Sequence, residues 1–399
     1  MQSAMIVDAV RIPRATLRGT SAYAALRPVE LLWPLFTAIA ERNHLDSSHV
    51  EDVLLGCATQ SGGQGANVAK IAALYAGWSE QVSGVTVNRF CCSGLDAINL
   101  AASKIMSGME SVLVAGGVEQ LSAVPMFADQ GDWFSNPKVM KATKFMHMGL
   151  SADLITTQQA YSRERLDAYA LQSHRRANHA ASHDYFKHSL VPVCDANNAP
   201  LLDSDNAVRA GLTLEKLAAL PASFTDYVQH GQALVSQRYP DTRLQAHHSA
   251  GSSPALVDGA SLLLLASESA CKKLSLTPRA RICHYANASD EPVKMLTGHL
   301  RATEKLLAAT GLQASDIDLW EVNESFAASV LYFQDYFNIA SEQLNVNGGA
   351  IAFGHPLGAT GGNLMGMLLD ELERRNLKRG IVAICGGAGV GVTTLIERL

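Results

Sequence analysis

Residues 82–117 read VSGVTVNRFCCSGLDAINLAASKIMSGMESVLVAGG, and this stretch decides the fold class. Val82–Val87 is apolar and rich in β-branched residues, which predicts a strand, and Ser111–Ala115 predicts another. Between them, Gly94–Met106 places its apolar residues at helical spacing, and Gly108 is a typical helix stop. A strand, a turn, a helix and a second strand in this order indicate α/β layers.

The C-terminal part of the chain repeats this plan. A helical pattern covers Gly358–Glu373, and strands are predicted at Ile381–Cys385 and Val392–Glu397. In both halves a strand ends in a pair of glycines, Gly116-Gly117 in the first half and Gly386-Gly387 in the second. From these local matches we interpret the two halves as a duplicated unit.

The stretch between the halves has a different composition. It is rich in His, Asn, Asp and Pro, and it contains one predicted amphipathic helix near Arg163–His183. We interpret it as an inserted loop domain, after which the apolar run Leu262–Ala266 predicts a buried strand that closes the first half. The predicted units are an N-terminal core domain (1–120 and 248–270), the loop domain (121–247) and a C-terminal core domain (271–399).

Composition excludes several classes of function. The chain has 399 residues, of which 48% are hydrophobic and 17% charged, which is enough for a large core in two or three structural units. With a net charge of −5 and no basic run, nucleic acid is not an expected partner. The apolar runs are too short to span a membrane, and no signal or transit peptide is evident, so we expect a cytoplasmic protein. The seven cysteines show no C-x-x-C pair, so we expect free thiols and no metal site.

Cys91 is the first candidate for chemistry. It lies between the predicted strand and helix, so it falls at a helix N-terminus, where unpaired N–H groups and the helix dipole favour a thiolate. For an isolated cysteine, a buried structural thiol is the more common interpretation.

Three further segments carry candidate side chains. The glycine-rich stretch Asn345–Gly361 contains His355, which would suit a base for a cysteine nucleophile. The alternative, a phosphate loop, is weaker because the Lys-Ser/Thr ending is missing. Cys385 ends a strand and meets four glycines, which suits either a core cysteine or a second acid/base group beside backbone donors for an oxyanion. Asn323, taken alone, is best interpreted as a helix N-cap.

Together these segments resemble the thiolase family. The match includes Asn-x-x-Cys-x-Ser-Gly at 88–94, Asn-Glu-Ser-Phe-Ala at 323–327, Asn-Gly-Gly-Ala-Ile-Ala-Phe-Gly-His-Pro-Leu-Gly-Ala-Thr-Gly at 347–361 and Cys-Gly-Gly-Ala-Gly-x-Gly at 385–391. The segments stand in the family's order, and the resemblance spans nearly the whole chain.

The resemblance implies the five-layered αβαβα thiolase fold, with two similar core domains and a loop domain that cradles coenzyme A. Cys91 matches the acylated nucleophile, and His355 matches the base that activates it. Cys385 matches the acid/base group that serves the substrate α-carbon. Asn323 matches the residue that holds an oxyanion-hole water with His355, while the backbone N–H groups of Cys91 and Gly387 match a second oxyanion hole.

The resemblance also implies contacts with coenzyme A, which would be a substrate and not a tightly bound cofactor. The chain departs from the family where a loop-domain cation is usual, at Leu220–Phe224, and where Ser252 and Pro254 replace a usual Asn and Ser. Thiolases need no metal and are usually homodimers or homotetramers. The residues expected to contact coenzyme A are His147, Met148, Ala250, Ser253 and Phe326.

The expected activity is thiolytic cleavage of a 3-ketoacyl-CoA to acetyl-CoA, or to a shortened acyl-CoA, through an acyl-cysteine. The motif Asn-Arg-Phe-Cys and the length of the stretch Phe224–His248 resemble degradative thiolases more than biosynthetic ones. The alternatives are a biosynthetic acetoacetyl-CoA thiolase, a non-catalytic CoA-binding homologue and a Cys/His hydrolase. The intact set of Cys91, His355 and Cys385 argues against the homologue without catalysis.

A histidine-rich helix face offers one further hypothesis. His179 and His183 stand four residues apart, with His174 nearby, so two imidazoles on one face could bind a metal. We favour a solvated face for these three residues.

Overall fold

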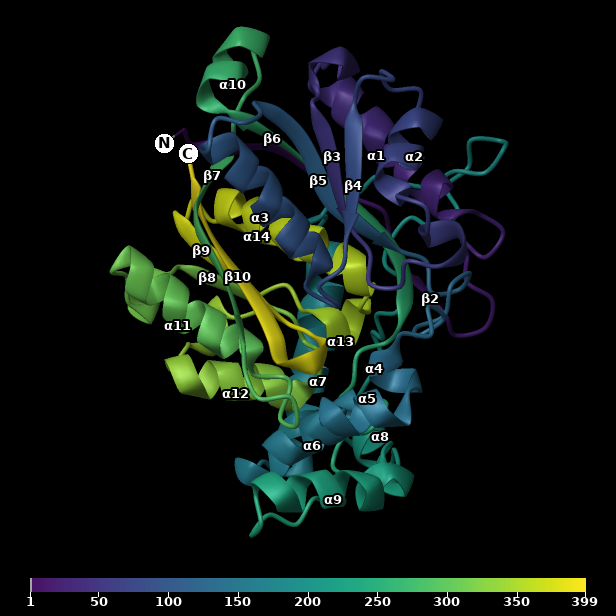
Figure 1. The fold of residues 1–399 in the computed structure, drawn as a ribbon, viewed down its shortest axis with the longest axis vertical. Coiled ribbons are helices and arrows are strands. Elements are labelled where there is room, and N and C mark those ends of the chain that lie inside the picture. Colours follow the sequence, from purple (N-terminus) through teal and green to yellow (C-terminus); the bar gives the residue numbers. More distant parts are fainter. Residues whose placement is uncertain (1) are drawn as a thin grey trace.

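The structure is a computed structural model that describes residues 2–399. Its layers run from α1 and α2, through one half of a large sheet, to a central layer of α3 and α14, then through the other half of the sheet to α11 and α12 (Figure 1). This is the five-layered αβαβα arrangement that the family resemblance implies. The layer helices are α1 (Pro28–Arg42), α2 (Val68–Tyr75), α3 (Ser93–Met106), α11 (Gly298–Thr310), α12 (Ala327–Phe337) and α14 (Thr360–Arg374).

The strands form one ten-stranded sheet in the order β4-β3-β5-β6-β1-β7-β10-β9-β8, with the short β2 paired to β6. Their bounds are β1 (Ala4–Arg11), β2 (Ala15–Thr16), β3 (Asp52–Gly56), β4 (Ser83–Val87), β5 (Val112–Glu119), β6 (Val257–Ser267), β7 (Ala280–Ser289), β8 (Leu319–Val322), β9 (Arg379–Cys385) and β10 (Val390–Arg398).

The two halves of the sheet are built alike, as the predicted duplication requires. In the first half, β3 is parallel to β4 and β5, and β6 pairs antiparallel with both β5 and β1. In the second half, β9 is parallel to β8, and β10 pairs antiparallel with both β9 and β7. The halves meet where β1 pairs antiparallel with β7.

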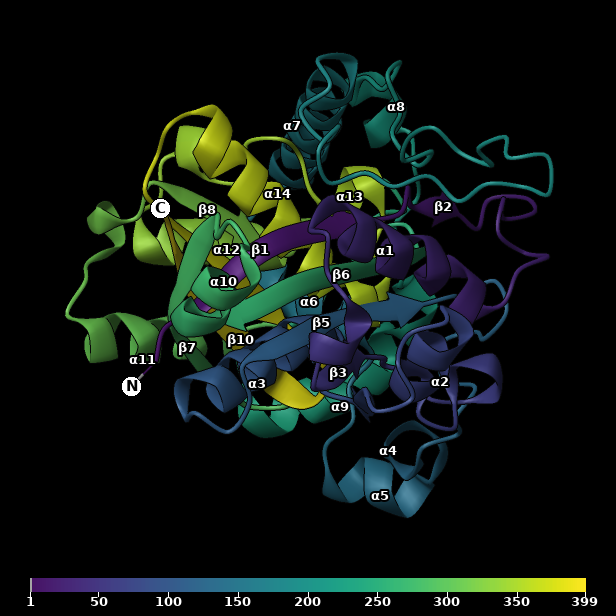
Figure 2. The ribbon, with the colours of Figure 1, turned by 90° about the horizontal axis from the view of Figure 1, so that it is seen from above.

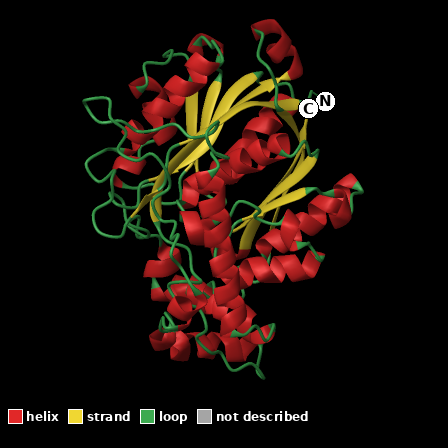
Figure 3. Ribbon diagram, turned by 180° about the vertical axis from the view of Figure 1, so that it is seen from behind, coloured by secondary structure: helices red, strands yellow, loops and turns green. Residues whose placement is uncertain are grey.

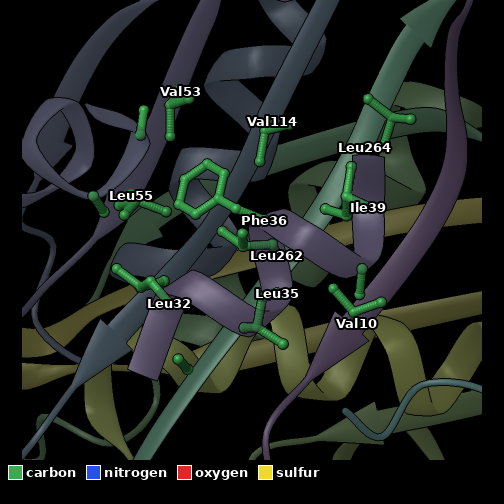
Figure 4. Close-up of a cluster of buried hydrophobic side chains, with 14 of the residues drawn as sticks. Val10, Leu32, Leu35, Phe36, Ile39, Val53, Leu55, Val114, Leu262 and Leu264 are labelled. Atoms are coloured by element: carbon green, nitrogen blue, oxygen red, sulfur yellow. The ribbon is translucent and has the colours of Figure 1, made fainter. Parts of the chain in front are cut away.

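The core of the first half lies between α1 and its sheet (Figure 4). Apolar residues at helical spacing on α1 face apolar residues from five strands, so each element buries one stripe or one face. Phe36 also packs edge-on against Trp78, with 4.7 Å between ring centroids. The side chains labelled in Figure 4 are Val10, Leu32, Leu35, Phe36, Ile39, Val53, Leu55, Val114, Leu262 and Leu264.

The central helices α3 and α14 approach backbone to backbone through glycines. A Cβ added at Gly94 would collide with the carbonyl oxygen of Gly358, and one added at Gly361 would collide with the backbone of Leu95. Interiors are close-packed, so only glycine fits at these two positions. The contact fixes the start of α14 against the start of α3, and both candidate segments for chemistry stand at these starts.

Between β5 and β6 the chain forms helices joined by irregular segments, with a long irregular segment between α7 and α8, and these helices gather at one end of the molecule (Figure 3). From above, α4 and α5 project from the body (Figure 2). The helices of this region are α4 (Asp132–Ser135), α5 (Pro137–Ala142), α6 (Met148–Gln158), α7 (Arg163–Ser182), α8 (Leu214–Ala218) and α9 (Val228–Arg238). Two further helices are α10 (Glu268–Leu274), after β6, and α13 (Ala350–Phe353), before the candidate base.

Two local interpretations of the sequence are wrong. Asn323 is not a helix N-cap, because α12 begins four residues later, at Ala327, with Phe326 in the cap position. The histidines of α7 do not form one solvated face: His179 and His183 are exposed, but His174 is buried and accepts a hydrogen bond from the backbone of Arg209. The periodicity of α7 could not reveal which segment folds over His174.

Candidate active site

Cys91 lies in the turn between β4 and α3. The turn is closed by two side-chain hydrogen bonds, from the Phe90 N–H to Asn88 Oδ1 (2.8 Å) and from the Arg89 N–H to Ser93 Oγ (2.8 Å). Phe90 has a φ of +51°, a left-handed conformation that non-glycine residues adopt at a cost. The strained turn therefore presents Cys91 two residues before the first residue of α3, with Cys92 in the N-cap position.

Burial controls the ionisation of Cys91. Burial, together with the nearby Cys385 and Glu119, raises the pKa of the thiol to about 12. The expectation that the helix N-terminus holds a thiolate is therefore wrong for the free protein, because desolvation outweighs the dipole. A neutral Cys91 thiol needs a base before it can act as a nucleophile.

His355 can supply that base. Its Nδ1 lies 2.8 Å from Thr360 Oγ1, at the start of α14, while its buried Nε2 has no hydrogen-bond partner among the described residues. Burial, helped by the charge of Arg14, lowers the pKa of His355 to about 4. The imidazole is neutral at pH 7, and when Thr360 accepts a hydrogen bond from Nδ1–H, the lone pair on Nε2 is free to take a proton.

Cys385 contacts a serine that sequence reasoning missed. Its Sγ lies 3.2 Å from Ser325 Oγ, and Ser325 Oγ accepts a hydrogen bond of 2.8 Å from Asn323 Nδ2. Burial raises the pKa of Cys385 to about 11, whereas the hydrogen bond between Cys385 Sγ and Ser325 Oγ opposes this rise. The available signal was the serine in Asn-Glu-Ser-Phe-Ala, where the family's pattern has alanine.

One cavity of about 230 Å³ brings most of the candidates together. Cys91, His355 and Cys385 line it, together with Ser325. Of the residues expected to contact coenzyme A, four line the same cavity and the exposed Ala250 does not. Those four are His147, Met148, Ser253 and Phe326.

Asn323 and Gly387 lie outside this cavity, but close to it. Asn323 is fully buried behind Ser325, and its Oδ1 has no partner among residues 2–399. Gly387 lines a second cavity, which it shares with Cys91. The backbone N–H groups of Cys91 and Gly387 donate to no other backbone carbonyl in the described chain, so both remain available to an oxyanion.

Glu119, the last residue of β5, ties the two halves together behind the site. Its Oε2 accepts hydrogen bonds from the N–H groups of Ala58 (2.8 Å) and Gly358 (2.9 Å). Its Oε1 accepts from the Thr59 N–H (3.0 Å) and from Gln64 Nε2 (3.0 Å). This buried carboxylate accepts four hydrogen bonds. It therefore holds the turn after His355 against the loop after β3. Sequence reasoning gave Glu119 no role.

The departures from the family's pattern have local structural roles. Ser252 is buried, and its Oγ accepts a hydrogen bond of 3.0 Å from the Ser249 N–H. Pro254 lines the main cavity, and Phe224 packs its ring between those of His147 and Phe326. Phe224, Phe326 and Pro254 give the cavity an apolar lining on this side.

No group of three or more His, Cys, Asp or Glu side chains in residues 2–399 is arranged to hold a metal ion. No helix in the same range is long and apolar enough to cross a membrane.

Comparison with known proteins agrees with this geometry. Family models for the thiolase N-terminal and C-terminal domains match residues 4–231 and 276–398. A 3-ketoacyl-CoA thiolase of Cronobacter sakazakii is 37% identical over 100% of both chains. A steroid 3-ketoacyl-CoA thiolase of Mycobacterium tuberculosis is 36% identical, and the alignment covers 100% of this chain and 95% of that protein. The crystal structure of the Bacillus anthracis acetyl-CoA acetyltransferase superposes with a TM-score of 0.87 at 33% identity, covering 100% of this chain and 99% of that one.

Proposed function

Because this chain belongs to the thiolase family and is an acyltransferase, we propose that it cleaves a 3-ketoacyl-CoA with coenzyme A through an acyl-cysteine at Cys91. One observation supports Cys91 as the nucleophile and His355 as its base. The Nε2 atom of the neutral His355 has no hydrogen-bond partner within residues 2–399, and His355 lines the same cavity as two neutral thiols. A cavity with one base and two thiols suits a reaction in which one sulfur forms a bond to carbon and the other moves a proton.

The first step makes the acyl-enzyme. His355 Nε2 takes the proton from Cys91 Sγ, and the sulfur attacks the 3-keto carbon of the substrate. The N–H groups of Cys91 and Gly387 donate to the oxygen that becomes negative. The bond between C2 and C3 then breaks, and its electron pair moves to C2 as the acetyl-CoA enolate. Asn323 and His355, with a water, stabilise the enolate oxygen, and the Cys385 thiol protonates C2.

The second step returns the enzyme to its starting state. Coenzyme A gives its thiol proton to the Cys385 thiolate, and its sulfur attacks the thioester carbonyl carbon on Cys91. The carbonyl re-forms as the bond from carbon to Cys91 Sγ breaks. The Cys91 thiolate then recovers its proton from the protonated His355, so all atoms and charges balance.

The same residues catalyse the reverse condensation, and the likeness to an acetyl-CoA acetyltransferase supports acetoacetyl-CoA synthesis as a second candidate function. We favour cleavage because the curated relatives with full-length similarity are 3-ketoacyl-CoA thiolases. Comparing cleavage of several 3-ketoacyl-CoA chain lengths with acetyl-CoA condensation under the same conditions separates the two.

The assignment of Cys91 is tested by mass spectrometry after brief exposure to acetoacetyl-CoA. We expect an acetyl adduct on Cys91, and no adduct in Cys91→Ala. An adduct on the neighbouring Cys92, or on Cys385 alone, would overturn the assignment. Cys92 is a suitable internal control because it is fully buried and its thiol lies 3.2 Å from the Ile384 carbonyl oxygen.

The role of His355 is tested by His355→Ala, measured as the rate of Cys91 acylation against pH. Loss of a general base typically costs about 10²–10⁴-fold, and we expect that loss at pH 7 together with a higher apparent pKa of Cys91. The pKa of His355, about 4, predicts that the parent loses this advantage only as the pH falls through that value. An unchanged profile in a folded variant would assign the base elsewhere.

We further propose that coenzyme A approaches through the loop domain, and that the predicted units 1–120 with 248–270, 121–247 and 271–399 act as the two core domains and the loop domain. All seven cysteines are free thiols, which suits a reducing compartment such as the cytoplasm. The proposed assembly is a homodimer or homotetramer through the exposed edge strand β4.

A further inference from the structure

Cys91 borders a second cavity, which the proposed reaction leaves without an occupant. This cavity measures about 60 Å³, roughly a quarter of the main one, and its lining includes Gly387 and Met148. The main cavity holds the acid/base groups and the expected coenzyme A contacts, so coenzyme A and its acetyl group belong there. The acyl remainder that stays on Cys91 after cleavage therefore has to enter the second cavity.

Aromatic rings wall this second cavity. Phe90, Phe127, Trp133 and Phe134 all line it, and Trp133 and Phe134 come from the projecting helix α4 (Figure 2). The Trp133 ring lies 5.0 Å from that of Phe90, and the Phe127 ring lies 4.4 Å from that of Phe134. The polar residues at the cavity are few, and the carboxylate of Asp129 stands exposed at its rim.

Trp133 stands closest to the chemistry. A Cβ added at Gly387 would lie only 3.1 Å from Trp133 Cη2 and 3.1 Å from Phe90 Cγ, so both rings cover the glycine of the proposed oxyanion hole. Behind Trp133, Phe145 packs edge-on at 4.9 Å, which keeps the indole from swinging outward. A ring held on both sides sets a firm limit on the acyl group beside it.

On the basis of the proposed function, we infer that this chain is selective for 3-ketoacyl-CoAs with a short acyl remainder, and that Trp133 is the residue that sets the limit. A cavity of about 60 Å³ has room for roughly four water-sized groups. Acetyl to butyryl remainders fit this space, whereas a long chain has to displace Trp133. Trp133 and Phe134 belong to the peripheral helix α4, so this part of the wall can be altered without substituting Cys91, His355 or Cys385.

The test compares kcat/KM for acetoacetyl-CoA, 3-ketooctanoyl-CoA and 3-ketododecanoyl-CoA in the parent, in Trp133→Ala and in Phe134→Ala. In the parent we expect kcat/KM to fall by at least about tenfold from the shortest to the longest substrate, since single methylene groups in a pocket already discriminate by this amount. Trp133→Ala should reverse or abolish the fall, measured as the ratio of kcat/KM for the longest substrate to kcat/KM for acetoacetyl-CoA. Phe134→Ala should act in the same direction, and it keeps the test valid if Trp133→Ala does not fold.

Trp33→Ala is the matched control, because Trp33 is 53% exposed on α1 and lines neither cavity. It should leave the chain-length profile unchanged. A parent that cleaves all three substrates equally well would overturn the inference, and so would folded variants at Trp133 and Phe134 that keep the parent's profile. If none of the substrates acylates Cys91, the proposed function itself fails, which is a different result.

Discussion

At the scale of single residues, Ser325 separates this chain from the family's usual pattern. Its hydroxyl links Asn323 to Cys385, and the hydrogen bond to the thiol works against the rise in pKa that burial causes. In the proposed mechanism, run in the condensing direction, the thiolate of Cys385 removes a proton from the acetyl-CoA methyl group. A hydroxyl that stabilises this thiolate makes more of it available at a given pH.

We therefore predict that Ser325→Ala raises the pKa of Cys385 above about 11. A hydrogen bond to a charged group contributes about 1.5–3 kcal/mol, so exchange of deuterium into the acetyl-CoA methyl group should slow by about tenfold or more below pH 9. The measurement is NMR in deuterated buffer across a pH series, where the rising limb of the rate should move to higher pH.

Ser325→Thr keeps a hydroxyl and should restore most of the exchange rate. If Ser325 only supported the local structure, Ser325→Ala would lower the exchange rate at every pH, and the pH at which the rate rises would not change. An unmoved limb in Ser325→Ala, with the protein folded, would mean that Ser325 does not act through Cys385.

At the scale of elements, the contact between α3 and α14 positions both candidate segments for chemistry. Gly361→Ala would force a methyl group into the backbone of Leu95. Overpacking of this kind costs about 1–3 kcal/mol and occasionally more. We predict a lower Tm in thermal unfolding and a lower kcat, because α14 carries Thr360, the partner of His355, in its first turn.

Gly366→Ala, in the same helix, is the matched control. A Cβ at Gly366 would meet only Ala9 Cβ at 3.5 Å and Ser189 Cβ at 4.0 Å, both ordinary contacts. Alanine is a better helix former than glycine by about 0.5–1 kcal/mol, so Tm should stay level or rise. Equal changes in Tm and kcat for the two substitutions would show that the close approach of α3 and α14 does not determine stability or activity.

At the scale of the whole molecule, one edge of the sheet is open. β4 ends the sheet order, its residues are exposed or half-buried, and the Cys91 turn follows it directly. Exposed strand edges with apolar neighbours pair readily with another chain. Exposed apolar side chains on β4 and on helices that pack near it are Ile71, Leu74, Tyr75, Val85 and Leu100.

We predict that two copies of this chain pair through β4, and that Val85→Lys weakens the pairing by at least about tenfold, which corresponds to about 1.4 kcal/mol. In a twofold interface the same residue occurs on both sides, so one substitution places two like charges at the contact. Light scattering after size exclusion, over a range of concentrations, measures the effect. Leu214→Lys, on the distant α8 and 45% exposed, should leave the assembly intact, and a monomeric parent would refute the pairing.

The sequence by itself determined the alternation of strands and helices, the duplication and the identity of the candidate groups. These features are local: the β-rich run before Cys91, the helical spacing after it and the glycines around His355 can all be read from neighbouring residues. The predicted helices and strands of both halves agree with α3, β5, α14, β9 and β10 to within a few residues, whereas the five-layered arrangement was implied by the resemblance to the thiolase family.

Only the tertiary structure decided what surrounds those groups. Burial makes the Cys91 thiol and the His355 imidazole neutral, although the helix N-terminus suggested a thiolate. The fold also brings Ser325 to Cys385, closes Trp133 over Gly387 and buries His174. The physical reason is that desolvation and packing depend on segments far apart in the chain, which periodicity and motif spacing do not contain.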